Sequence, residues 1–149
     1  FLTQFPNLLQ EYQMFHSLLR FLPEQQFSIL AAEQVLCLVA ARKAGENGTV
    51  TGVDFSEEMI AKARESVSIT SNKNIEFHNA PAESLPFQAR FFDVVLANGI
   101  FNLNPLRDKI FGEIKRVLKP GGSVFAAEII FSIPRERPDN VIKINDWFA

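Results

Sequence analysis

The sequence has little cysteine, no basic run and no long apolar run, and each shortage excludes a class of protein. One cysteine, Cys37, excludes an internal disulfide and a cysteine-rich zinc site, and it suits a cytoplasmic location. Fifteen Lys and Arg residues are interspersed among seventeen Asp and Glu residues, so we expect no nucleic-acid partner. The apolar run at 124–133 has about half the length of a membrane span and contains Glu128. We therefore expect no membrane partner.

The apolar content is sufficient for one globular domain. Hydrophobic residues make up 47% of the 149 residues and charged residues 21%. Apolar residues recur at steps of three and four over residues 5–22, which predicts an amphipathic helix. A second short helix is predicted over residues 27–32. Residues 1–32 are therefore interpreted as an N-terminal helical segment and residues 33–149 as an α/β domain.

The stretch from Thr49 to Met59 is the most informative part of the chain. It begins as a β-rich run, stops on Asp54 and continues as a helical pattern that Ser56 is predicted to cap. A carboxylate at the carboxyl end of a strand in an open α/β sheet lies where the ribose hydroxyls of a nucleoside can be held. Asp is also a preferred helix N-cap, so this segment alone leaves both roles open.

Four segments in a fixed order carry a resemblance to a family. They are Gly52–Met59, Ala82–Phe87, Phe92–Asn98 and Arg116–Gly122. Together they resemble the class I S-adenosylmethionine-dependent methyltransferases, most of all the small-molecule branch that includes the ubiquinone/menaquinone and arsenite methyltransferases. The resemblance covers roughly residues 33–149. It implies a doubly wound, mostly parallel sheet of the Rossmann-like type, S-adenosylmethionine as cofactor and a small-molecule substrate as methyl acceptor.

The resemblance also implies roles for individual residues. The ribose and adenine side of the cofactor would lie beside Asp54, Phe55, Met59, Ala82 and Glu83. Its methionine part and the transferred methyl would lie beside Asn98 and Gly99, and the acceptor beside Phe101 and the N-terminal lid residues Tyr12 and His16. Core packing for Met59, an ordinary turn for Asn98 and Gly99 and a merely accommodated His16 stay open as alternatives. No catalytic residue is predicted.

The chain departs from the family pattern between Ala31 and Ala44. The family has a strand, a glycine-rich loop and a helix here, whereas these fourteen residues contain no glycine. They are too few for a strand of about five residues, a turn of about three and a helix of about ten. We therefore predict that Leu36 and Cys37 are not truly bonded and that a loop is missing between them. The alternative is a genuine deletion, which would prevent cofactor binding in the usual way.

Three functions remain in competition. The leading one is methyl transfer to a small molecule; Gly99, where arsenite methyltransferases carry a thiolate, speaks against arsenite as the acceptor. The second is an inactive methyltransferase-like binding or scaffolding module, which becomes the better interpretation if the Leu36–Cys37 bond is real. The third, a nicotinamide-dependent oxidoreductase, lacks the G-x-G-x-x-G motif. The oligomeric state stays open and includes a homodimer.

Overall fold

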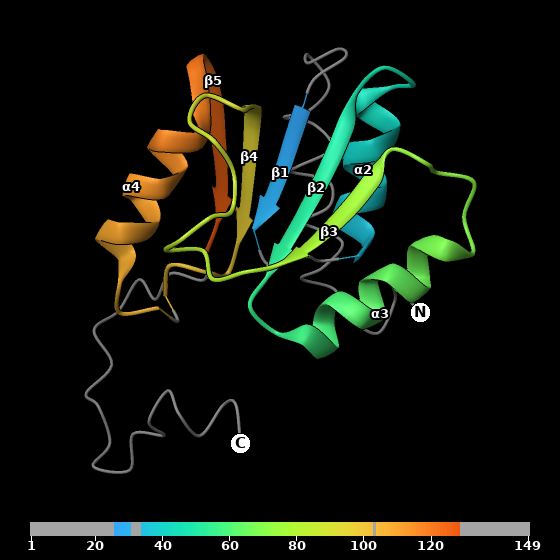
Figure 1. The fold of residues 1–149 in the computed structure, drawn as a ribbon, viewed down its shortest axis with the longest axis horizontal. Coiled ribbons are helices and arrows are strands. Elements are labelled where there is room, and N and C mark those ends of the chain that lie inside the picture. The colour runs from blue at the N-terminus through green and yellow to red at the C-terminus, as the bar shows by residue number, and fades with distance from the viewer. Residues whose placement is uncertain (1–25, 31–33, 103, 129–149) are drawn as a thin grey trace.

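The computed structural model describes residues 26–30, 34–102 and 104–128, which form a five-stranded parallel sheet with helices (Figure 1). The elements are β1 (Gln26–Leu30), α2 (Gln34–Ala44), β2 (Thr49–Asp54), α3 (Glu57–Ser68), β3 (Ile75–Asn79), β4 (Phe92–Asn98), α4 (Arg107–Val117) and β5 (Leu118–Ala127). The strand order is β3-β2-β1-β4-β5. The predicted helix over residues 5–22 lies outside the described residues.

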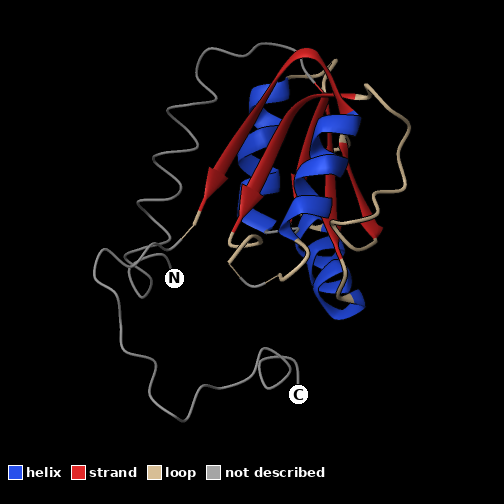
Figure 2. Cartoon of the chain, turned by 90° about the vertical axis from the view of Figure 1, so that its left-hand side faces the viewer, coloured by secondary structure: helices blue, strands red, loops and turns tan. Residues whose placement is uncertain are grey.

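The helices lie on both faces of the sheet, which confirms the predicted doubly wound fold (Figure 2). One core cluster joins α2 and α3 to the sheet, and its largest members include Phe27, Leu36 and Ile60. The second cluster joins α4 to the opposite face and includes Phe92 and Ile110. The chain changes faces between the neighbouring strands β1 and β4, so the topological switch point lies there.

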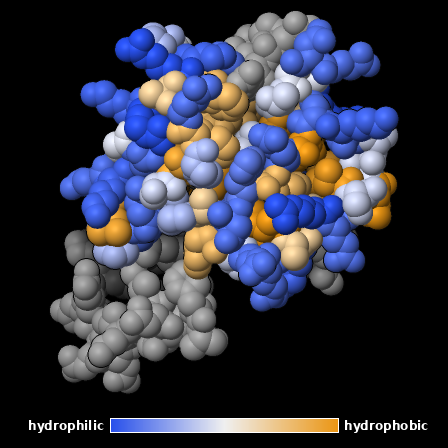
Figure 3. Space-filling model, in the orientation of Figure 1, coloured by the Kyte–Doolittle hydropathy of each residue, from blue (hydrophilic) through white to orange (hydrophobic). Residues whose placement is uncertain are grey.

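The face of the sheet that packs against α4 is covered by less helix than the face that packs against α2 and α3. Among the described elements α4 is the helix of this face, and residues 80–91, hereafter the β3–β4 loop, add Leu85 and Phe87 to the cover. Apolar residues lie at the surface between hydrophilic ones on the side that faces the viewer of Figure 1 (Figure 3). No helix within the described ranges is long and apolar enough to cross a membrane.

Strand β4 is near-continuously apolar because helices or the β3–β4 loop cover both of its faces. Val94 and Leu96 belong to the first core cluster, and Val95 and Ala97 to the second. Phe92, at the start of the strand, also belongs to the second cluster, and the register with β5 shifts between Phe92 and Val94. This strand therefore lies at the centre of the core.

The first strand lies earlier than predicted, and the predicted short helix over residues 27–32 is wrong. Residues Gln26–Leu30 form β1, which pairs with β2 on one side and with β4 on the other. Phe27 is fully buried between the two neighbouring strands and α2. A short apolar run can be a central strand or a buried helical segment, and periodicity does not distinguish the two.

Helix α2 passes through Leu36 and Cys37, between which the sequence predicted a missing loop. Helix α2 runs from Gln34 to Ala44 without interruption, and both residues are buried on its core-facing side. Since β1 precedes residue 31, the following fourteen residues have to supply only a connection and a helix. The connection between β1 and α2 is Ala31–Glu33 in the sequence, and it contains no glycine.

The helices that follow β2 and β4 are α3 and α4, and the cap of α3 is the predicted one. The Ser56 hydroxyl caps α3 by accepting a hydrogen bond from the Met59 N–H at 3.3 Å. The core face of α4 carries Ile110, Ile114 and Val117.

Strand β5 begins at Leu118 and contains an irregularity near its start. Leu118 already pairs with Phe92, and the next pair joins Ser123 to Val94. Lys119–Gly122 therefore form a bulge within the strand, where Gly121 has a φ of 82°. Glycine adopts this left-handed conformation without the steric cost of a side chain.

Candidate functional site

The predicted cofactor residues meet at the carboxyl edge of the sheet. Asp54 ends β2 and pairs with Asn79 at the end of β3, while Asn98 ends β4 and pairs with Ala127 of β5. The arrowheads of Figure 1 all point to this edge. Ligands of open α/β sheets bind outside the carboxyl ends of the strands at the switch point, so this edge is the candidate site.

The two carboxylate oxygens of Asp54 differ in their hydrogen bonds to the described residues. Its Oδ1 accepts a hydrogen bond from the Ser56 N–H at 2.8 Å, and this contact shapes the turn into α3. Its Oδ2 accepts none from the part of the chain that the structure describes. The residue is half-buried, and Ser56, not Asp54, caps the helix. The alternative of Asp54 as helix N-cap is therefore wrong.

Two apolar side chains lie exposed just after Asp54. Phe55 is 59% exposed and Met59 is 41% exposed. Met59 is absent from both core clusters, so the alternative of core packing for this residue is wrong. Exposed apolar side chains beside a carboxylate suit a ligand that joins a flat ring to a diol.

Asn79 is a residue of this edge that the sequence reasoning missed. Its Nδ2 donates to the backbone oxygens of Asp54 and Phe55 at 3.1 and 2.9 Å. The side chain therefore holds the turn that carries both residues. A polar residue at the end of a predicted strand was the signal that could have indicated it.

The β3–β4 loop brings Ala82 and Glu83 to the same edge. The loop begins with the Ala80 N–H, which donates to the Asp54 backbone oxygen at 3.0 Å. Ala82 and Glu83 are both half-buried, and Glu83 Oε2 accepts a hydrogen bond from Asn104 Nδ2 at 3.2 Å. Glu83 thus connects the β3–β4 loop to the segment that precedes α4.

The middle of the β3–β4 loop is bound to α4 by an ion pair. Glu113 Oε2 accepts the Leu85 N–H at 2.8 Å, while Arg116 donates to the carbonyls of Leu85 at 3.0 Å and Phe87 at 2.6 Å. The hydrogen bond from Arg116 lowers the pKa of Glu113, against the raising effect of partial burial. The same bond raises the pKa of Arg116. The sequence reasoning missed this pair, although its i, i+3 spacing was a signal.

The loop after β4 carries the residues predicted for the methionine side. Gly99 has a φ of 66°, and its N–H donates to the Ala127 carbonyl at 2.9 Å. Glu128, which was not predicted, accepts the N–H groups of Phe101 at 2.8 Å and Asn102 at 3.2 Å. Asn98 is half-buried at the start of this loop. The two contacts of Glu128 hold the loop against the end of β5.

Phe101 lies in the core. It is 7% exposed, and its ring stacks on that of Phe111 with 4.4 Å between centroids. This placement favours packing over contact with an acceptor. Tyr12 and His16, the other residues predicted for the acceptor, lie outside the described residues.

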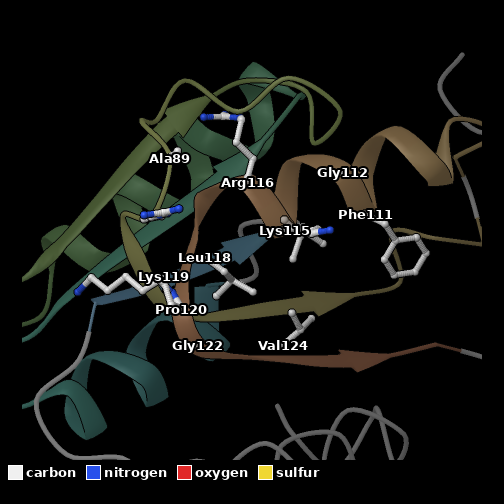
Figure 4. A pocket seen from close by; sticks show the side chains of 12 residues that line it. Ala89, Phe111, Gly112, Lys115, Arg116, Leu118, Lys119, Pro120, Gly122 and Val124 are labelled. Carbon is white, nitrogen blue, oxygen red and sulfur yellow. The ribbon is translucent and has the colours of Figure 1, made fainter.

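A groove of about 760 Å³ lies between α4 and β5, away from the carboxyl edge (Figure 4). Arg90, Lys115 and Lys119 line it together with the exposed apolar side chains of Phe111 and Val124. It contains none of the predicted cofactor residues. The groove is therefore separate from the candidate site.

Comparison with known proteins agrees with this arrangement. Residues 31–143 match a family described as a methyltransferase domain. An arsenite methyltransferase of Halobacterium salinarum is 38% identical over 105 residues, which cover 70% of this chain and 26% of that protein. A demethylmenaquinone methyltransferase of Lactococcus lactis is 42% identical over 84 residues, 56% of this chain and 33% of that protein. The chain thus spans about a quarter to a third of the length of these relatives.

A solved structure supports the fold. The crystal structure of a SAM-dependent methyltransferase from Aquifex aeolicus superposes with a TM-score of 0.73 at 20% identity, over 85% of this chain and 67% of that one. The likeness at this identity concerns the fold alone. The family match extends over most of the chain and includes β2, β4 and the carboxyl edge. The chain belongs to the class I S-adenosylmethionine-dependent methyltransferase family, as its sequence motifs predicted.

Proposed function

We propose that the protein transfers a methyl group from S-adenosylmethionine to a small organic acceptor. The observation that carries the proposal is Asp54, which ends β2 at the carboxyl edge and leaves Oδ2 without a partner among the described residues. Relatives named arsenite and demethylmenaquinone methyltransferase support a small acceptor. We also infer a cytoplasmic location.

The residues of the carboxyl edge fit the parts of this cofactor. Asp54 would accept hydrogen bonds from the ribose hydroxyls, and the exposed side chains of Phe55 and Met59 would cover the adenine. Ala82 and Glu83 would border the adenine on the other side. Carboxylate, apolar surface and loop backbone are the groups that a nucleoside requires from a protein.

The methionine side would be formed by the loop after β4. Asn98 and Gly99 lie where β4 ends at the switch point, and the left-handed Gly99 carries no side chain that would block a ligand. The cofactor, when bound, supplies both the methyl group and its leaving group. The protein then has to hold the acceptor in line with the methyl carbon and exclude water, so no acid or base is required.

A methyltransferase-like module without methyl transfer is the second candidate. The continuous helix α2 and the glycine-free Ala31–Glu33 favour it, since a glycine-rich loop lets the backbone approach the methionine end. The first N–H groups of α2 nevertheless follow the end of β1 and would be available to a carboxylate. This second candidate predicts cofactor binding without turnover, or no binding at all.

The position of Cys37 favours an organic acceptor over arsenite. Arsenic is held by thiolates, and Cys37 is the chain's one cysteine. It is fully buried in α2 and belongs to the core, not to the carboxyl edge. Gly99 stands where the resemblance places a thiolate in arsenite methyltransferases.

Calorimetric titration with S-adenosylhomocysteine tests the proposed function. Asp54→Ala should weaken binding by roughly 1–3 kcal/mol because it leaves the ribose hydroxyls unpaired. Ser56→Ala is the matched control, since it removes the cap of α3 but keeps the Asp54 carboxylate and should lower stability alone. A wild-type protein that binds no S-adenosylhomocysteine contradicts the proposal, and an unchanged affinity of Asp54→Ala assigns the carboxylate to the turn only.

The absence of nucleic acid and the homodimer stay predictions. The edge of β5 that does not pair with β4 has no strand partner among the described elements. Light scattering over a range of protein concentrations measures the oligomeric state, and a mass that stays that of one chain contradicts the homodimer.

A further inference from the structure

The β3–β4 loop has buried backbone without the hydrogen bonds of a helix or strand. Residues 80–91 contain neither element, yet Leu85 in their middle is 5% exposed. Buried N–H and C=O groups almost always have partners, because burying them unpaired is costly. Side chains of α4 supply these partners.

Glu113 and Arg116 bind the loop as a neighbouring strand would. Glu113 accepts the Leu85 N–H, and Arg116 donates through Nη2 to the Leu85 carbonyl and through Nη1 to the Phe87 carbonyl. The pair is also bidentate, with 2.7 Å from Arg116 Nε to Glu113 Oε1 and from Nη2 to Oε2. Each side chain fixes the geometry of the other, so the loop is held by a preformed fork.

The same loop is bound to the candidate site at its other end. The Ala80 N–H donates to the Asp54 carbonyl, and Glu83 accepts from Asn104. Ala82 and Glu83 therefore lie between an attachment to β2 and an attachment to α4. A shift of Leu85 would be transmitted to both residues because Glu83 and Ala82 lie two and three residues before it in the chain.

We propose that Glu113 and Arg116 are positioning residues for cofactor binding, because they hold Ala82 and Glu83 of the β3–β4 loop at the carboxyl edge. This inference rests on the proposed function. Neither side chain touches the cofactor in this proposal. A purely stabilising pair would lower the unfolding temperature when it is broken but would leave the affinity of the folded protein unchanged.

Variants of both residues test the proposal in the full-length protein. Arg116→Ala removes the fork, Arg116→Lys keeps the charge but not the planar geometry, and Glu113→Gln removes the pairing charge at nearly constant shape. Lys119→Gln is the matched control, since it breaks an ion pair with Asp93 at 2.9 Å that does not touch the loop. The two ion pairs have similar exposure. The Arg116 side chain is 36% exposed and that of Glu113 is 19% exposed. The Lys119 side chain is 39% exposed and that of Asp93 is 29% exposed.

The measurements are the affinity for S-adenosylhomocysteine well below the unfolding temperature and the amide hydrogen exchange of residues 82–88 in the free protein. Arg116→Ala should weaken the affinity by about tenfold, which corresponds to ~1.4 kcal/mol, and should speed the exchange of the loop. Arg116→Lys should recover part of the affinity and part of the protection from exchange. Glu113→Gln should weaken the affinity and speed the exchange by smaller amounts than Arg116→Ala. Lys119→Gln should lower the unfolding temperature alone.

The outcomes separate this inference from the proposed function. In one outcome the wild type binds, and the folded Arg116→Lys and Glu113→Gln variants bind as tightly as the wild type and as Lys119→Gln. The positioning role is then overturned, whereas the proposed function stands. Unchanged exchange of residues 82–88 in these variants overturns it as well. If the wild type does not bind S-adenosylhomocysteine, the proposed function is overturned and the positioning role with it.

Discussion

Replacement of Asn74 by Asp should destabilise the protein, because this change of one side-chain atom removes a donor that lies within reach of three carbonyl oxygens. Asn74 precedes β3, and its Nδ2 lies 3.0 Å from the Gly45 carbonyl, 3.1 Å from that of Gly48 and 3.3 Å from that of Ala41. One amide thus serves the end of α2 and the turn into β2. Asp has the same shape but presents an oxygen where the donor was.

The expected loss follows from the number of acceptors. The amide has two protons for three carbonyls, so we count two hydrogen bonds, each with a net contribution of about 1 kcal/mol. Repulsion between a carboxylate oxygen and the carbonyl oxygens adds to this loss, reduced by solvent because Asn74 is only half-buried. We expect a loss of about 2–4 kcal/mol in the free energy of unfolding, or about 4–16 °C in the unfolding temperature.

Urea denaturation followed by circular dichroism measures this loss as a lower midpoint with an unchanged slope. Asn72→Asp is the matched control, because the Asn72 side chain has a single hydrogen bond within the described ranges, to Thr70 Oγ1 at 3.3 Å. This substitution should cost less than ~0.5 kcal/mol. The deficit of Asn74→Asp should shrink as the pH falls, since protonation removes the charge that the folded state disfavours. Equal midpoints for the two variants at neutral pH would refute the reasoning.

Three further predictions concern packing and pH. Gly48→Ala should lower stability by about 1–3 kcal/mol in urea denaturation, because its Cβ would lie 2.6 Å from that of Ala44 and closer still to the Ala44 carbonyl oxygen; a neutral change would contradict the contact. Phe92→Ala should cost about 3–5 kcal/mol, since the ring is fully buried, and a loss below ~1 kcal/mol would exclude this packing. The lowered pKa of Glu113 stabilises the fold above the ordinary value of 4.5, and this contribution is lost as the pH falls through the lowered pKa. Glu113→Gln should therefore flatten the acid side of the stability profile, and an unchanged profile would contradict the role of this ion pair.

The sequence by itself determined the parts of the protein that depend on local chemistry. The Ser56 cap of α3 and the end of β2 at Asp54 follow from neighbours within a few residues. The apolar run of β4 follows from burial on both faces, which its composition records directly. The four motifs then identified the family, because their order restricts the chain more than any one of them does.

Only the tertiary structure decided which residues form the first strand. Gln26–Leu30 is a strand because β2 and β4 lie on both sides of it, and such pairing partners are not visible in a five-residue segment. With β1 placed there, α2 passes through Leu36 and Cys37.

Long-range hydrogen bonds were equally out of reach of the sequence. Glu113 and Arg116 meet backbone groups of the β3–β4 loop about thirty residues away in the sequence. The partners of a side chain are set by how the chain folds back, whereas its propensities are set by its neighbours. For this reason the sequence located the residues of the carboxyl edge, and the structure alone showed what holds them there.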